Sequence, residues 1–294
     1  MSNFWSGWVI VIALANILGC VWLIWWASRP KKGEAAKGSV TGHTWDDDLQ
    51  ELNNPMPRWW LWLFYITIVF GLAYIIIYPG FGAYKGTAGW TQTGQYEAEM
   101  KAAKETYGPI FSAYAKQDAE KLVSNKTAMD SGRRLFMTYC ATCHGSDARG
   151  SQGYPNLSDN DWIYGGQPEQ IKASILDGRR GAMPGFAHLG EKGIEAVSNH
   201  VMTLSGRKAD ADKAAAGKTI FEAQCVACHG ADAKGNIFIG APNLTDKTWL
   251  YGSTKAHIIQ SVTKGRNGVM PAHREFLGED KVHLLSAYIY SLSK

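Results

Sequence analysis

Cysteine is scarce in this 294-residue sequence, and two long stretches of it carry no charge at all. Only five cysteines are present, and four of them lie in two short motifs, so a framework of disulfides is not expected. The net charge is only +4 and no dense basic stripe occurs, which argues against nucleic acid as a partner. The sequence also lacks a glycine-rich nucleotide-binding loop and a recognisable nucleophile–base pair, so it offers no catalytic machinery of its own.

The two uncharged stretches, residues 2–28 and 59–84, are rich in aliphatic and aromatic side chains. About 20 apolar residues in a helix cross a bilayer core of ~30 Å, so each stretch is long enough to span a membrane. The first has no basic segment before it and is too long for a cleaved signal peptide. We therefore predict transmembrane helices at 1–28 and 59–84, and Cys20 in the first is expected to be inert packing.

The loop at 29–58 has basic residues next to both helices, namely Arg29, Lys31, Lys32 and Arg58. Short basic loops stay in the cytoplasm, so both termini are expected on the outer, periplasmic side. The acidic run Asp46–Asp48 inside this loop is expected to be a solvated turn and not a metal site.

The motif Cys140-Ala141-Thr142-Cys143-His144 recurs as Cys225-Val226-Ala227-Cys228-His229. C-x-x-C-H is the attachment signature of a c-type haem, in which both thiols form thioethers and the histidine binds iron. A redox dithiol does not need the adjacent histidine. A zinc ribbon would place its cysteine pairs roughly 15–20 residues apart, whereas here they lie 85 apart. We therefore predict two covalent haems, held by Cys140, Cys143, Cys225 and Cys228 with His144 and His229 as ligands.

The two motifs belong to internal repeats, which we place at 127–207 and 208–294. A connector at 85–126 precedes them, with helical spacing of its apolar residues and Pro109 expected in the first turn of its helix. A helix is expected to close each repeat, at about 193–204 and 279–292. The positions that match between the repeats include Gly132 and Gly217, Phe136 and Phe221, Pro155 and Pro242, Trp162 and Trp249, Tyr164 and Tyr251, Arg179 and Arg266, and Met183 and Met270.

Each repeat is similar to the small, all-helical class I cytochrome c domain, so the resemblance implies an all-α fold. In that family a methionine commonly followed by proline binds the second face of the iron, which implies Met183 and Met270. Ligation within each repeat is the simplest expectation, but exchange of the methionines between repeats stays open. The resemblance also implies that the carbonyls of Pro155 and Pro242 accept from the ligand histidines. It suggests propionate contacts for Arg179, Arg266, Trp162 and Trp249.

The segment Trp45-Asp46-x-Asp48-Leu49-x-Glu51-Leu52-Asn53-Asn54-Pro55-x-Pro57-Arg58-Trp59-Trp60 resembles the anchor of a particular family. It is the dihaem cytochrome c subunit, subunit P, of cbb(3)-type haem–copper oxidases. The resemblance implies a bacterial inner-membrane subunit that takes electrons from soluble periplasmic cytochrome c. These would pass to a monohaem cytochrome c subunit and then to the haem–copper subunit that reduces oxygen. The first apolar helix departs from the many members that have only one.

Two other functions remain open from the sequence. One is the cytochrome subunit of a periplasmic dehydrogenase that passes electrons to quinone, against which the anchor segment argues. The other is a haem-based sensor or assembly protein, which would need an iron ligand that can leave. A relay between partners fits best, because histidine and methionine would fill both axial positions of each iron.

Overall fold

The computed structural model describes residues 1–294, most of which lie in helices. The chain divides into two compact units, Met1–Lys104 and Glu105–Lys294, each with its own internal packing. The predicted class, two apolar helices plus helical cytochrome domains, holds in outline. The finer prediction of an all-α chain does not account for the two-stranded antiparallel sheet that each unit also contains.

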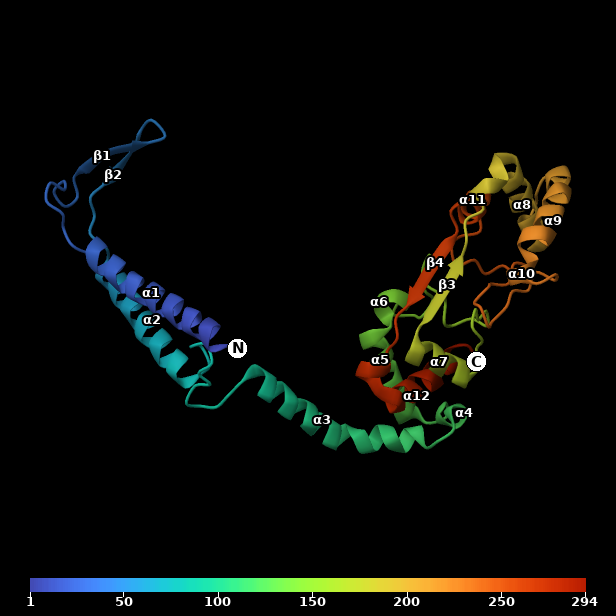
Figure 1. The fold of residues 1–294 in the computed structure, drawn as a ribbon, viewed down its shortest axis with the longest axis horizontal. Coiled ribbons are helices and arrows are strands. Elements are labelled where there is room, and N and C mark those ends of the chain that lie inside the picture. Colours follow the sequence, from blue (N-terminus) through green and yellow to red (C-terminus); the bar gives the residue numbers. More distant parts are fainter. The chain divides into compact units, whose positions relative to one another are not determined.

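Two apolar helices dominate the first unit, α1 (Asn3–Ala27) and α2 (Arg58–Ile77), and they lie side by side (Figure 1). Both are long and apolar enough to cross a membrane, and almost none of their side chains is buried. A helix that is apolar all round needs an apolar surrounding, either a protein core or lipid. The helix α2 ends before Pro79, because the residue before a proline is pushed into extended conformation. Residues 78–84, which were included in the second predicted span, therefore lie outside the helix.

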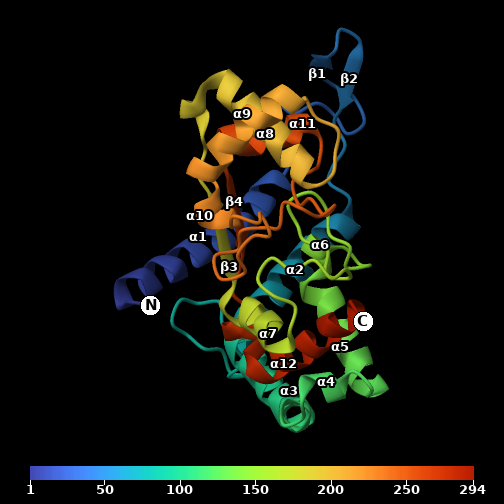
Figure 2. The same ribbon diagram turned by 90° about the vertical axis from the view of Figure 1, so that its right-hand side faces the viewer.

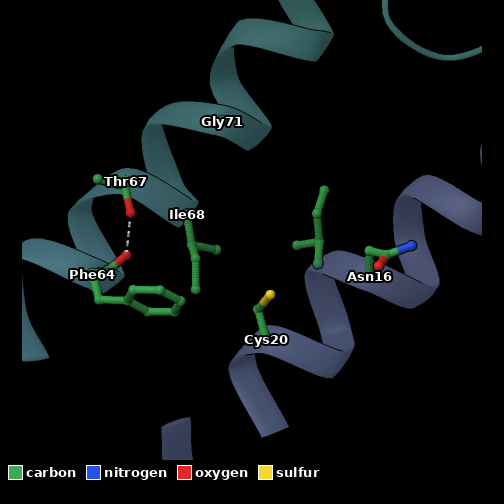
Figure 3. A pocket seen from close by; sticks show the side chains of 7 residues that line it. Asn16, Cys20, Phe64, Thr67, Ile68 and Gly71 are labelled. Carbon is green, nitrogen blue, oxygen red and sulfur yellow. Dashed lines mark hydrogen bonds between the residues drawn. The ribbon is translucent and has the colours of Figure 1, made fainter. Parts of the chain in front are cut away.

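The two apolar helices enclose a shallow groove, shown in Figure 3. Its lining comes from Asn16, Ile17 and Cys20 of α1 and from Phe64, Thr67, Ile68 and Gly71 of α2. The polar side chains here bond within their own helices: Asn16 Nδ2 donates to the Ile12 carbonyl at 2.8 Å and Thr67 Oγ1 to the Phe64 carbonyl at 2.7 Å. Such internal satisfaction is what a helix surrounded by lipid requires.

Between these helices the chain forms a hairpin of β1 (Val40–Trp45) and β2 (Leu49–Leu52). Asp46 and Asp47 at its turn both have positive φ, the conformation that tight hairpin turns favour. The acidic run is therefore an exposed hairpin turn. The helix α3 (Gln92–Ala115) follows α2 and contains Pro109 in its interior, so the prediction that Pro109 opens the connector helix is wrong.

The second unit is built from short helices and one ribbon of two strands. The first repeat contributes α5 (Lys126–Tyr139), α6 (Ala141–His144), α7 (Pro168–Asp177), β3 (Arg179–Met183) and α8 (Gly190–Leu204), preceded by α4 (Ala119–Leu122). The second contributes α9 (Ala211–Gln224), α10 (Val226–His229), α11 (Lys255–Lys264), β4 (Arg266–Met270) and α12 (Arg274–Leu292), which is interrupted at Gly278.

The two repeats exchange their closing segments. One core joins Phe136 of α5 and Ile175 of α7 to Leu285 and Ile289 of α12, which belongs to the other repeat. The second core joins Val197 of α8 to Phe221 of α9 and to the apolar face of α11. Figure 2 shows α8 beside α9 and α11, with α12 beside α5 and α7. Each packed half therefore combines elements of both repeats. The repeat limits at 127–207 and 208–294 stay a prediction from the sequence.

The strands β3 and β4 connect the two halves, and they pair with each other in antiparallel orientation (Figure 1). In their register Arg179 lies opposite Met270 and Met183 lies opposite Arg266. Gly178 and Gly265 precede the strands with φ of +70° and +73°. A Cβ at Gly178 would lie 2.5 Å from the Met270 carbonyl oxygen, so the close crossing of the two chains requires glycine there.

A glycine of α9 lets the helices α8 and α9 approach closely. A Cβ at Gly217 of α9 would lie 2.1 Å from the carbonyl oxygen of Ala196 in α8. We expect Gly217→Ala to destabilise the protein by about 1–3 kcal/mol, because the added methyl forces the helices apart. Chemical denaturation followed by tryptophan fluorescence measures this. The control is Ala215→Ser, an exposed position on the same helix, and equal stability of the two variants would contradict the expectation.

Candidate haem-binding sites

Each C-x-x-C-H motif lies at the end of a helix, on a single additional turn. The helix α5 ends at Tyr139, and Cys140 caps it and leads into α6, whose last residue is His144. The second motif repeats this geometry, with Cys225 between α9 and α10 and His229 at the end of α10. One turn of helix keeps both cysteines and the histidine of each motif close together.

Both motif histidines are buried and held by a carbonyl. His144 is 9% exposed and its Nδ1 lies 2.9 Å from the Pro155 carbonyl oxygen. His229 is 8% exposed and its Nδ1 lies 3.1 Å from that of Pro242. With Nδ1 donating, Nε2 keeps its lone pair and the ring orientation is fixed, as metal-bound histidines require. The proline contacts implied by the resemblance are therefore present.

The pKa directions of these groups fit metal binding by the histidines and do not fit a redox dithiol. Burial lowers the pKa of His144 and of His229, which favours the neutral imidazole that binds metal. Burial, aided by the neighbouring Cys143, raises the pKa of Cys140 to about 11, and burial likewise raises the pKa of Cys225. A reactive redox dithiol instead needs a lowered cysteine pKa, so the alternative of a thioredoxin-like centre finds no support.

None of the four motif cysteines forms a disulfide, and the first cysteine of each motif is less exposed than the second. Cys140 and Cys225 are half-buried, whereas Cys143 and Cys228 are exposed. The two cysteines of each motif are the residues that would hold a covalent haem.

The structure places each candidate methionine with the motif of the other repeat. Met270 packs against the core that contains Phe136, together with Cys140 and Ala141 of the first motif. Met183 packs against the core that contains Phe221, together with Cys225 and Val226 of the second motif. The simplest expectation from the sequence, methionine and histidine from one repeat, does not agree with this packing.

The exchange extends beyond the methionines. His273, three residues after Met270, is close enough to His144 to contribute to the lowering of its pKa, although burial is the larger cause. Its backbone N–H also donates to the Ile175 carbonyl of the first repeat, at 3.0 Å. The symmetric contact joins the Phe186 N–H to the Val262 carbonyl at 2.8 Å. The segment that follows each methionine is therefore anchored on the other repeat.

Sequence reasoning gave Arg179 and Arg266 a candidate role but named the tyrosines beneath them only as matching positions of the repeats. The Arg179 guanidinium lies 4.9 Å from the ring centre of Tyr164, and that of Arg266 lies 4.4 Å from Tyr251. Both tyrosines stand at matching positions of the repeats, which is the signal that could have found them. Trp162 and Trp249 pack against the two cores, as aromatic neighbours of the motifs.

Two known protein families match segments of this chain. Residues 37–85 match the family described as the N-terminal domain of cytochrome oxidase-cbb3, FixP. Residues 127–201 and 212–289 both match the family described as cytochrome c oxidase, cbb3-type, subunit III. The matched regions cover the anchor segment with its apolar helix and both haem repeats.

Relatives similar along the whole chain carry the same designation. A cbb3-type cytochrome c oxidase subunit CcoP of Rubrivivax gelatinosus is 44% identical over 300 residues, covering 100% of this chain and 98% of the relative. A subunit FixP of Bradyrhizobium sp. (strain ORS 278) is 40% identical, covering 86% and 94%. A subunit CcoP of Cereibacter sphaeroides is 37% identical, covering 90% and 98%. With both family matches and this full-length similarity, the chain belongs to the CcoP/FixP family of cbb3-type cytochrome c oxidase subunits.

Proposed function

We propose that this chain is the membrane-anchored dihaem electron-transfer subunit of a cbb3-type terminal oxidase. One observation carries the proposal: on either side of one ribbon, the first cysteine of a C-x-x-C-H motif and the methionine of the other repeat pack against the same core. Haem bound there supplies one-electron exchange at iron, with no coordination position left for a substrate. The chain itself holds the ligands, excludes water and sets the potentials.

The ligand set of each haem is drawn from both repeats. The first haem is attached to Cys140 and Cys143, with His144 and Met270 as its iron ligands. The second is attached to Cys225 and Cys228, with His229 and Met183. The cores around Phe136 and Phe221 support this assignment, because each contains the cysteine side of one motif and the methionine of the other repeat.

The apolar helices α1 and α2 are proposed to span the bacterial inner membrane. Their length and composition support this, and the basic residues that flank loop 29–58 favour a cytoplasmic loop. Both termini and the haem pockets would then face the periplasm. There the subunit would take electrons from soluble periplasmic cytochrome c and relay them, through a monohaem cytochrome c subunit, to the haem–copper subunit.

Purification in mild detergent through a tag at Lys294 tests the proposed function. A haem–copper subunit should co-purify, and the preparation should consume oxygen when supplied with reduced cytochrome c. Co-purification of a dehydrogenase without oxygen uptake would instead support a cytochrome that serves a periplasmic dehydrogenase. Binding of carbon monoxide by the reduced, isolated chain would contradict two methionine-ligated irons.

A further inference from the structure

The hairpin between the two apolar helices has no covering within its own chain. Every residue of its strands β1 and β2 is exposed, and none belongs to a buried core. Trp45 and Leu49 lie opposite each other beside the turn and are 59% and 64% exposed. A two-stranded hairpin is at best marginally stable alone in water. An exposed indole and leucine at its tip are typical of a surface that a protein partner covers.

The same hairpin is strongly acidic. Residues 40–52 contain the carboxylates of Asp46–Asp48 and Glu51 and no lysine or arginine, so their net charge is −4. None of these carboxylates forms an ion pair within the chain. Two basic residues of the loop, Arg29 and Lys31, instead lie over tryptophan rings at the end of α1, 3.7 and 3.8 Å from the ring centres. The negative charge of the hairpin is therefore free to meet a cationic partner.

Short connections keep the hairpin close to the end of α2. Only residues 53–57 separate β2 from α2, and a link of this length spans at most about 20 Å. The base of the hairpin is closed by Asn53, whose N–H donates to the Ser39 carbonyl at 2.8 Å. With α1 and α2 across the membrane, as proposed above, the hairpin can meet only partners that present a surface at the cytoplasmic face of the membrane.

Charge distinguishes the two surfaces that are present at that face. The cytoplasmic leaflet contains anionic lipids, which attract basic segments and repel acidic ones. The cytoplasmic loops of membrane proteins, in contrast, are enriched in lysine and arginine. An acidic hairpin with an apolar pair beside its carboxylates is therefore complementary to a basic loop of a membrane protein, and not to the lipid surface.

We propose that this hairpin docks onto a lysine- and arginine-rich cytoplasmic loop of another membrane subunit of the oxidase. Trp45 and Leu49 form the apolar anchor of the contact, and the carboxylates of Asp46–Asp48 face the cations of the partner. This inference rests on the proposed function, which supplies both the membrane topology and the oxidase as the complex. It adds a docking element on the cytoplasmic side that takes no part in holding haem.

Two variants separate the charge of the hairpin from its apolar anchor. The triple variant Asp46→Asn, Asp47→Asn, Asp48→Asn removes three charges and keeps the turn, because asparagine tolerates the φ of +47° and +69° at the first two positions. We expect it to raise the apparent dissociation constant for the oxidase about three- to tenfold at low salt and to weaken the salt dependence. Trp45→Ala should raise it about tenfold or more at low and at high salt, as loss of an interface anchor does.

Dilution of the detergent-solubilised complex, followed by recapture on a tag at Lys294, measures this constant. The control is Glu34→Gln, an exposed acidic residue of the same loop outside the hairpin, which should behave as the unmodified chain does. Two attached haems in every variant show that the haem-binding unit is intact.

A photoreactive benzoylphenylalanine in place of Leu49 identifies the partner in intact membranes. A cross-link to a basic cytoplasmic loop of an oxidase subunit supports the proposal. Cross-linking to lipid alone, or unchanged dissociation constants in both variants, overturns it. If the unmodified chain itself recovers no haem–copper subunit, the proposed function fails. If it does recover that subunit and the variants do so equally well, only the docking of the hairpin fails.

Discussion

Replacing Met270 with leucine is expected to lower the potential of the haem attached to Cys140 and Cys143, although this methionine belongs to the other repeat. Thioether sulfur stabilises ferrous iron, and leucine offers no ligand atom. Because axial ligands set haem potentials over about 0.8 V, we expect a fall of about a few tenths of a volt. Met183→Leu should lower the potential of the second haem in the same way.

To assign each effect to one haem, the methionine variants are made in a chain that can attach only one haem. Cys225→Ala with Cys228→Ala leaves only the first haem attached, and in that chain Met270→Leu should abolish the sulfur-to-iron band while Met183→Leu preserves it. Met202→Leu, a packing methionine next to the second core, is the control and should preserve the band. In the intact chain each ligand variant should lose half of the band intensity. The opposite pairing, with Met183→Leu removing the band of the first haem, would show ligation within the repeats.

Leu285→Ala in α12 is expected to loosen the pocket of the first haem. Leu285 is fully buried in the core that contains Phe136, so its loss should cost about 2–5 kcal/mol through lost burial and a cavity. The site lies in the second repeat by sequence but in the first pocket by packing. Denaturant titration of the full chain, with the sulfur-to-iron band followed beside tryptophan fluorescence, measures the effect.

The matched variant is Val197→Ala in α8, which is buried in the core that contains Phe221. It should weaken the second pocket, and by less, since only two methyl groups are removed. In the single-haem background Leu285→Ala should therefore release methionine ligation at lower denaturant than Val197→Ala does. If Val197→Ala has the larger effect on the first haem, the packing of the exchanged helices is incorrect.

The haem motifs and the apolar helices could be predicted from the sequence because both are local patterns. C-x-x-C-H needs only five neighbouring residues, and an uncharged run such as 2–28 needs no partner to be recognised. The contact of His144 with the Pro155 carbonyl was instead an implication of the family resemblance, and the structure contains it.

The exchange between repeats could not be predicted, because two similar repeats offer two similar sets of partners. The apolar faces of α8 and α12 fit either half, and which half each joins depends on the crossing at Gly178 and Gly265. The ribbon was missed for a related reason. The alternation over Arg179–Met183 spans only five residues and needs its pair in β4 to become a strand. The interior position of Pro109 in α3 shows that a proline can be tolerated within a long helix.

The crossing of the strands has a consequence for the order of biosynthesis. A chain is made from its N-terminus, so His144 is synthesised long before Met270. The first haem would thus be attached while its second axial position is still open, and it would close only when almost the entire chain has emerged. For the second haem, Met183 would already have been synthesised when the motif at Cys225 emerges. On the proposed function, maturation of the two sites would therefore be asymmetric in time, although their residues are arranged almost symmetrically in space.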